Sequence, residues 1–263
     1  MHERLWVSTI GFGAVPVADV LGPLAAHGIT RLGVPVVQLE TGDRIANLAA
    51  LRSSGCSVLD LVEPTAFTLD DPARWPAERD RLRHCVELAA AVAAPVLYLT
   101  TGPSRRLLWD EAADAFRDAI APVRADADAA GVRLAIENTT TMRADLGFLH
   151  GLADTVEAAA LAGIAVCADL FAAWTDRDLQ AAIAAGAQRF ALVQVADFVL
   201  GTTSTPDRAV PGDGDIAIGR QLGWLAEAGY TGPIELELLG PRISAEGPAA
   251  AAARAATIVS ALM

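Results

Sequence analysis

The chain has 263 residues, of which 53% are hydrophobic, and carries a formal net charge of −12. This length and apolar content suffice for one large core, and no linker or repeat divides the chain, so we expect a single domain over residues 1–263. The negative charge argues against nucleic acid as a partner, because binding a phosphate backbone depends on clustered positive charge.

Short apolar runs alternate with alanine-rich helical stretches eight times along the chain. In chain order, the predicted strands are Leu5–Phe12, Arg31–Leu39, Val58–Glu63, Val96–Thr100, Arg133–Glu137, Ala165–Leu170, Phe190–Ala196 and Ile234–Leu238. The predicted helices lie near residues 16–27, 43–54, 76–93, 110–130, 147–162, 176–185, 216–228 and 247–261. Strands rich in Val, Ile and Leu that alternate with helices predict a parallel sheet covered by helices, and eight such units favour an α/β fold closed as a single (β/α)8 TIM barrel.

An open, doubly wound sheet is the alternative to the closed barrel. Such sheets often bind a dinucleotide through three spaced glycines after the first strand. Here Gly11-Phe12-Gly13-Ala14 lacks the third glycine and Pro16 follows. The barrel is therefore the favoured fold.

The N-terminus and the cysteines indicate where the protein resides. Met1-His2-Glu3-Arg4 leads straight into an apolar run without a signal-peptide pattern, and nowhere do 18 apolar residues follow one another. We therefore expect a cytoplasmic protein that does not associate with a membrane. The three cysteines, Cys56, Cys85 and Cys167, are odd in number and widely spaced, which predicts reduced core thiols.

All twenty basic residues are arginines. The absence of lysine excludes Schiff-base aldol chemistry and pyridoxal phosphate chemistry, because both require a lysine amine.

Four oxygen-bearing side chains lie near the ends of predicted strands in the second half of the chain: Glu137, Asp169, Gln194 and Glu237. Their separations of 32, 25 and 43 residues are each close to one strand-plus-helix unit of a barrel. Because the carboxyl ends of barrel strands meet at one rim, we expect the four side chains to converge. Three carboxylates and an amide suit a hard divalent cation, so the sequence predicts one catalytic metal ion.

The donor set also favours certain metals. With no thiolate or imidazole among the candidate ligands, Mn²⁺ or Mg²⁺ is favoured over Zn²⁺, and Co²⁺ or Ni²⁺ could substitute.

Two glutamates compete for the last ligand position. Glu235 and Glu237 have the same parity on the predicted strand, and Glu237 is closer to the rim where barrel active sites lie. We choose Glu237. Glu235 would then lie roughly 6.6 Å deeper, where it needs a partner such as Arg133 or Arg189.

Loop residues after the strands are candidates for contacting a substrate. Arg143 and Arg208 follow the fifth and seventh predicted strands and could bind a carboxylate, phosphate or hydroxyl, although solvated loop arginines are an equal alternative. Phe171 and Trp174 follow the sixth strand and could stack against a sugar ring.

Several segments of the second half resemble the xylose isomerase-like barrels, a superfamily that holds sugar isomerases and epimerases, hydroxypyruvate isomerase, dehydratases and endonuclease IV. The segments are Leu134-Ala135-Ile136-Glu137-Asn138, Asp169-Leu170-Phe171, Val193-Gln194-Val195-Ala196-Asp197, Pro211-Gly212-Asp213-Gly214-Asp215 and Gly229-Tyr230-Thr231-Gly232-Pro233-Ile234-Glu235-Leu236-Glu237. The resemblance implies metal ligation by Glu137, Asp169, Gln194 and Glu237. Glutamine at the third position is more similar to hydroxypyruvate isomerase and some dehydratases than to members with histidine there.

The chain departs from this pattern in two places. Many relatives carry a histidine three residues after the aspartate, where this chain has Ala172. The endonuclease branch needs several histidines for its zinc cluster, whereas His2, His27, His84 and His150 lie at the terminus or in predicted helices. We therefore do not expect nuclease chemistry.

The resemblance and the candidate ligands together imply a divalent-metal-dependent isomerase or epimerase of a sugar, keto-sugar or related hydroxy-carbonyl compound. Glu137 and Glu237 would remove and return a proton through a metal-bound enediolate. A dehydratase acting on a keto-cyclitol or dehydroshikimate-like substrate is the nearest alternative, and a non-catalytic sugar-binding or partner subunit is another. We expect a small-molecule substrate. The sequence is compatible with both a monomer and a homo-oligomer.

Overall fold

Eight parallel strands close into one barrel in the computed structural model, which describes residues 1–263. The strands are β1 Leu5–Ser8, β2 Arg31–Pro35, β3 Ser57–Glu63, β4 Val96–Leu99, β5 Arg133–Glu137, β6 Ala165–Asp169, β7 Phe190–Val195 and β8 Ile234–Leu236. Each strand pairs with the next along the chain, and β1 closes the barrel on β8 with Leu5 opposite Ile234. The predicted (β/α)8 fold is confirmed.

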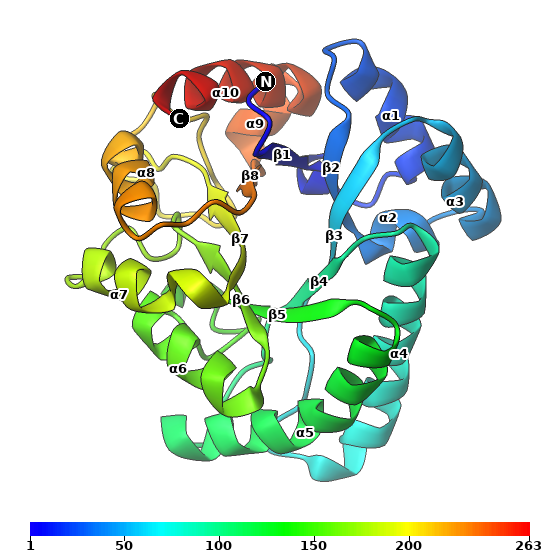
Figure 1. Ribbon diagram of the computed structural model, residues 1–263, viewed down its shortest axis with the longest axis vertical. Coiled ribbons are helices and arrows are strands. Elements are labelled where there is room, and N and C mark those ends of the chain that lie inside the picture. The colour runs from blue at the N-terminus through cyan, green and yellow to red at the C-terminus, as the bar shows by residue number, and fades with distance from the viewer.

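The helices form the outer layer around the barrel (Figure 1). They are α1 Val17–Ala25, α2 Val36–Glu40, α3 Arg44–Ser53, α4 Trp75–Ala91, α5 Trp109–Ala129, α6 Leu152–Ala162, α7 Leu179–Gly186, α8 Ile218–Glu227, α9 Pro241–Glu246 and α10 Pro248–Leu262. Short 3-10 helices are η1 Thr9–Phe12, η2 Pro72–Arg74, η3 Thr141–Arg143 and η4 Ala187–Arg189. The chain ends meet beside α10, where the backbone N–H of His2 donates to Ser260 Oγ at 2.9 Å.

The apolar core has two parts. A large cluster of 70 buried residues lies mainly between the strands and the helices. A second cluster of nine consists of strand residues such as Tyr98, Ala135 and Cys167. Ala135 and Cys167 share strand faces with Glu137 and Asp169, so this small cluster fills the barrel interior beneath those carboxylates.

The first two strands are shorter than predicted. Residues Thr9–Phe12 form a 3-10 helix rather than the end of β1, and Val36–Glu40 form α2 rather than the end of β2. Gly11 permits the first change, because a Cβ there would lie 2.4 Å from the carbonyl oxygen of Leu238. Pro35 ends β2, since proline has no N–H for the strand ladder.

Two features of the helices also differ from the prediction. The helix expected from residue 147 begins at Leu152, and a short helix that was not predicted, α9, precedes α10 and is separated from it by Gly247, whose φ is 95°. Glycine adopts this left-handed conformation without the strain of a side chain, so the chain turns there.

All three cysteines are unpaired, with Cys85 and Cys167 buried and Cys56 half-buried. None of the helices combines the length and the apolar character needed to cross a lipid bilayer.

Candidate functional site

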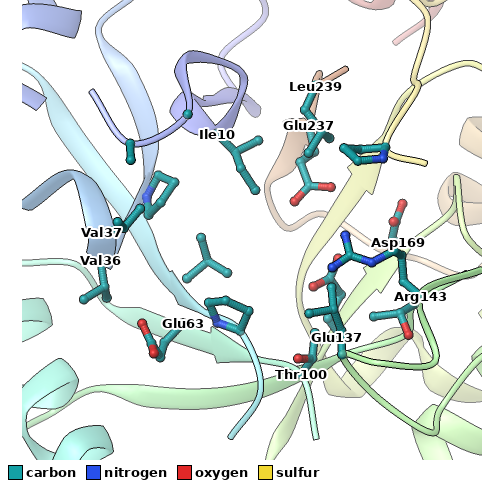
Figure 2. Close-up of a pocket in the computed structure, with 18 of the residues that line it drawn as sticks. Ile10, Val36, Val37, Glu63, Thr100, Glu137, Arg143, Asp169, Glu237 and Leu239 are labelled. Carbon is teal, nitrogen blue, oxygen red and sulfur yellow. The ribbon is translucent and has the colours of Figure 1, made fainter. Parts of the chain in front are cut away.

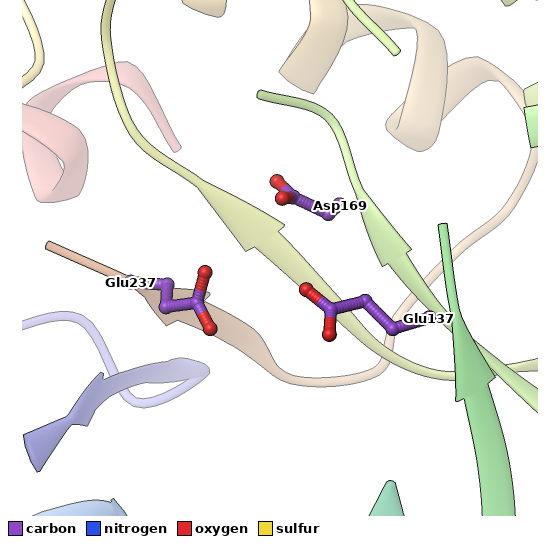
Figure 3. Close-up of side chains that lie close together, drawn as sticks. All are labelled: Glu137, Asp169 and Glu237. Atoms are coloured by element: carbon purple, nitrogen blue, oxygen red, sulfur yellow. The ribbon is translucent and has the colours of Figure 1, made fainter. Parts of the chain in front are cut away.

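Three carboxylates converge at the carboxyl ends of the barrel strands. Glu137 ends β5, Asp169 ends β6 and Glu237 follows the last residue of β8. One oxygen from each side chain lies within 4.8 Å of the others. Figure 3 shows the carboxylates of Glu137 and Glu237 pointing toward each other from opposite sides of the barrel. The expected convergence of these three residues is therefore observed.

Burial alters the ionisation of this cluster. Burial raises the pKa of Glu137 well above its usual range, and the negative charges of Glu237 and Asp169 raise it further. Burial also raises the pKa of Asp169 and of Glu237, while the charge of Arg208 opposes the rise in both. Three buried carboxylates this close repel one another unless positive charge neutralises them.

Asn138 fixes Glu137 and Asp169 relative to each other. Its Nδ2 donates to the carbonyl oxygen of Asp169 at 2.8 Å, and its Oδ1 accepts from the backbone N–H of Asp169 at 2.9 Å. The carboxylate of Asp169 is oriented in turn by the backbone N–H of Phe171, which donates to Oδ1 at 2.9 Å. The amide of Asn138 thus joins the ends of β5 and β6 at the site.

Gln194 lies on β7 beside these carboxylates, paired in the sheet with Asp169 and Glu235. Its Nε2 donates to Glu235 Oε2 at 2.9 Å and to Tyr98 Oη at 3.0 Å, with Glu237 Oε1 at 3.3 Å. Its Oε1 is buried and has no hydrogen-bond partner. The amide donor of Gln194, rather than its oxygen, is thus directed at the carboxylates of Glu235 and Glu237, and Gln194 does not line the pocket above them.

Glu235 lies deeper, next to Asp60 of β3. Both side chains are fully buried, and burial raises the pKa of each well above its usual range. Gly33 makes room for the pair, because a Cβ there would fall 1.8 Å from Glu235 Oε1. The prediction that Arg133 or Arg189 is the partner of Glu235 is wrong. Arg133 Nη2 instead donates to the backbone oxygen of Arg189 at 3.2 Å, in an exposed contact.

The acid pair should make metal-free stability depend on pH. The pKa of Asp60 is raised in the folded state. The stability that this carboxyl contributes is therefore fully present below the unfolded-state pKa of about 3.9, and it is lost as pH rises through the folded-state pKa. Asp60→Asn keeps the shape, removes the charge and supplies an N–H for the unpartnered Oε1 of Glu235. We expect Asp60→Asn to raise Tm at pH 8 and to change it little near pH 4.

Thermal unfolding of chelator-treated protein between pH 4 and pH 8 measures this effect. Asp128→Asn, at an exposed position of α5, is the matched control and should follow the wild type. A decline of Tm with pH that is the same in Asp60→Asn and wild type would contradict the assignment.

Arg208 reaches into the carboxylate cluster from the loop after β7. Its Nη2 contacts Asp169 Oδ2 at 2.8 Å and also contacts Glu237 Oε2, and its guanidinium lies 4.3 Å from the ring centre of Phe171. Burial lowers the pKa of Arg208, but the neighbouring carboxylates raise it by more, so it stays charged. The arginine therefore neutralises part of the cluster.

Asp197 holds the loop that carries Arg208. Its backbone exchanges two hydrogen bonds with Ala209, at 2.9 and 2.8 Å. Its carboxylate accepts from the backbone N–H groups of Gly212, Gly214 and Ile216 at 2.8 to 3.0 Å. The register of this loop directs the neighbouring Arg208 into the site.

The other predicted substrate residues divide into two groups. Arg143 and Phe171 line the pocket that contains the carboxylates, and Arg143 is paired there with Asp145 at 3.0 Å. Trp174 does not line it: its ring packs on Phe198, 5.7 Å between centres, and borders a separate hollow near α7 and α8. The expectation that Trp174 stacks on the substrate is therefore wrong for this pocket.

Tyr98 and Asp60 belong to the site but were not predicted from the sequence. The hydroxyl of Tyr98 donates to Glu237 Oε1 at 3.2 Å. The sequence contains a feature that could have indicated each of them. Asp60 is a carboxylate inside the apolar run Val58–Val62, and a tyrosine that faces a barrel interior needs a partner for its hydroxyl.

Comparison with known proteins agrees with the fold. The sequence matches the model of the family described as xylose isomerase-like TIM barrel over residues 6–258. The chain belongs to this family. No curated protein sequence matches it significantly.

Solved structures of the xylose isomerase-like fold superpose over nearly the whole chain. A protein from Sinorhizobium meliloti 1021 is 24% identical, with a TM-score of 0.85 and coverage of 99% of this chain and 96% of that one. The IolI protein, solved with a zinc atom, is 14% identical, with a TM-score of 0.83 and coverage of 98% and 97%. D-psicose 3-epimerase from Clostridium cellulolyticum H10, solved with D-tagatose, is 13% identical, with a TM-score of 0.79 and coverage of 98% and 97%.

The residues of this xylose isomerase-like barrel fit a divalent metal ion. Three carboxylate oxygens lie within 4.8 Å of one another, and the amide oxygen of Gln194 is buried without a partner. Hard cations bind such oxygen donors, and an ion would supply the positive charge that the cluster lacks. Glu137, Asp169 and Glu237 would hold it, and Gln194 stays a predicted fourth ligand.

Proposed function

We propose that the protein is a divalent-metal-dependent isomerase or epimerase of a hydroxy-carbonyl compound such as a sugar or keto-sugar. The observation that carries the proposal is the meeting of Glu137, Asp169 and Glu237 at the floor of a pocket of about 680 Å³. Because the donors are all oxygens, Mn²⁺ or Mg²⁺ is the preferred ion. A bound ion would polarise a substrate carbonyl and acidify the neighbouring C–H.

Glu137 and Glu237 are the proposed proton-transfer groups. Their carboxylates face each other across the cluster, so one can accept a proton from a substrate carbon and the other can return one from the opposite side (Figure 3). Tyr98 holds Glu237 by donating to Oε1. This placement supports inversion or relocation of a hydrogen rather than hydrolysis.

Arg208 is the proposed substrate-orienting residue. Its guanidinium is buried beside Asp169 and Glu237, and its N–H groups can donate to a substrate oxygen that gains negative charge during proton removal. Arg143, on the pocket wall, remains a proposed contact for the far end of the substrate.

Proton transfer can be tested with a panel of ketoses, cyclitols and hydroxy-carbonyl acids incubated in D2O with Mg²⁺ or Mn²⁺. We expect deuterium to enter the carbon next to the carbonyl without loss of water, as followed by NMR. Glu137→Gln and Glu237→Gln should each slow exchange at least about 100-fold, because the amide keeps an oxygen but cannot take a proton.

Glu157→Gln, at an exposed position of α6, is the control for these variants. Loss of water with a new near-ultraviolet absorbance would point instead to a dehydratase. If no compound of the panel shows either exchange or elimination, metal-assisted proton transfer is refuted and a non-catalytic binding protein is favoured.

A further inference from the structure

The pocket extends well beyond the carboxylate cluster. Its volume of about 680 Å³ lies in the middle of the roughly 300–1,000 Å³ range of pockets that hold drug-sized ligands. Figure 2 shows Val36, Val37 and Ile10 across the cavity from Asp169 and Glu137. A simple sugar bound at the carboxylates would leave this second half of the pocket unfilled.

The second half of the pocket has an apolar wall. The wall is formed by η1, the β2–α2 junction, the end of β3 with the residue after it, and the segment after β8, and consists of Ile10, Pro35, Val36, Val37, Val62, Pro64 and Leu239. Val37 leaves 48% of its surface exposed. A ligand that covered these side chains would gain free energy by removing apolar surface from water.

The charged groups in this half are already bonded within the protein. Arg81 contacts Glu63, and its Nη2 also donates to the carbonyl oxygens of Thr65 and Ala66 at 2.9 and 3.0 Å. His84 Nε2 lies 2.7 Å from Glu40 Oε1. Against the apolar wall, a second sugar ring would lose hydrogen bonds to water, whereas an apolar group loses none.

We propose that the substrate is amphipathic, with a hydroxy-carbonyl end at Glu137, Asp169 and Glu237 and an apolar substituent of at least aromatic-ring size against the wall around Val37. The inference rests on the proposed function and specifies its substrate class. Continuity of the wall with the carboxylate site makes one molecule, rather than two separate ligands, the occupant.

A matched pair of α-hydroxy ketones tests the proposal. Hydroxyacetone and 2-hydroxyacetophenone share the hydroxy-ketone end and differ by a methyl group against a phenyl ring. Their dissociation constants for Mg²⁺-saturated protein can be measured by ligand-observed NMR. We expect the phenyl ketone to bind at least about tenfold more tightly, as burial of a ring against apolar surface implies.

Two variants distinguish binding of the phenyl ring at the apolar wall from non-specific binding of the more hydrophobic ketone. Val37→Asp places a charge in the wall at the second residue of α2, where a helix tolerates an acid, and should bring the ratio of the two dissociation constants toward one. Ile45→Asp is the matched control, at the second residue of α3, 77% exposed and outside the pocket. It should preserve the preference.

The outcomes distinguish this proposal from the proposed function. Equal affinity for the two ketones, or a phenyl preference that survives Val37→Asp, would overturn the apolar subsite even if deuterium exchange occurs. A phenyl preference that depends on Val37 supports the subsite even if no compound of the panel exchanges deuterium, a result that would refute the proposed proton transfer but not the subsite.

Discussion

Asp169→Ala is expected to abolish stoichiometric binding of a divalent metal ion. Wild-type protein should bind about one Mn²⁺ per chain in isothermal titration calorimetry. Loss of outer-shell groups typically weakens metal sites 10–100-fold, so removal of a direct anionic ligand should weaken binding by at least about 100-fold. Asp169 lies within 4.8 Å of Glu137 and Glu237, and Glu137→Ala and Glu237→Ala should have comparable effects.

Two control variants define which carboxylates matter. Asp128→Ala removes an exposed acid of α5 and should bind Mn²⁺ as the wild type does. Glu235→Gln should also keep the metal, since Glu235 lies beneath the cluster and contacts Gln194 and Asp60. Full Mn²⁺ binding by Asp169→Ala would disprove the site. Loss of binding in Glu235→Gln with retention in Glu237→Ala would move the last ligand two residues along the strand.

The fold was predictable because its period is long and regular. Eight apolar runs, separated by helical stretches that commonly end in glycine, leave few topologies other than a closed parallel barrel. The errors lie where apolar residues continue past a strand, at Thr9–Phe12 and Val36–Glu40. Apolar character marks burial in both cases, but a 3-10 turn, a short helix and a strand can all be buried, so sequence pattern alone does not separate them.

The site was predictable to the extent that it depends on strand ends. A carboxylate inside an apolar run needs a function or a partner, and this argument located Glu137, Asp169 and Glu237. It was not extended to Asp60, and so the partner of Glu235 was missed. Contacts across a barrel join strands that are not neighbours in the sheet, and sequence spacing does not reveal them.

Loop residues were predicted less well because their direction depends on contacts far away in sequence. Arg208 enters the cluster because Asp197 fixes the loop around Ala209 through backbone and carboxylate hydrogen bonds. Trp174 packs on Phe198 instead of lining the pocket. Neither orientation follows from the position of a residue after a strand.

Arg208→Met is expected to make the stability of the protein depend strongly on metal. In the metal-free protein Arg208 neutralises Asp169 and Glu237, all three side chains being buried. Removing one partner of a buried ion pair typically costs about 3–5 kcal/mol, because the remaining charges lose their compensation. A divalent ion bound by the same two carboxylates restores positive charge, so saturating Mn²⁺ should recover most of the loss.

Urea unfolding with chelator and with saturating Mn²⁺ measures this coupling. The metal-induced gain in the free energy of unfolding should be larger in Arg208→Met than in wild type, whereas Arg106→Met, at an exposed loop arginine, should show the wild-type gain. Methionine retains apolar contact with the ring of Phe171, so the comparison isolates the charge. An equal loss of stability with and without Mn²⁺ would mean that the arginine and the ion do not neutralise the same carboxylates, and that Arg208 stabilises the loop rather than the metal-free site.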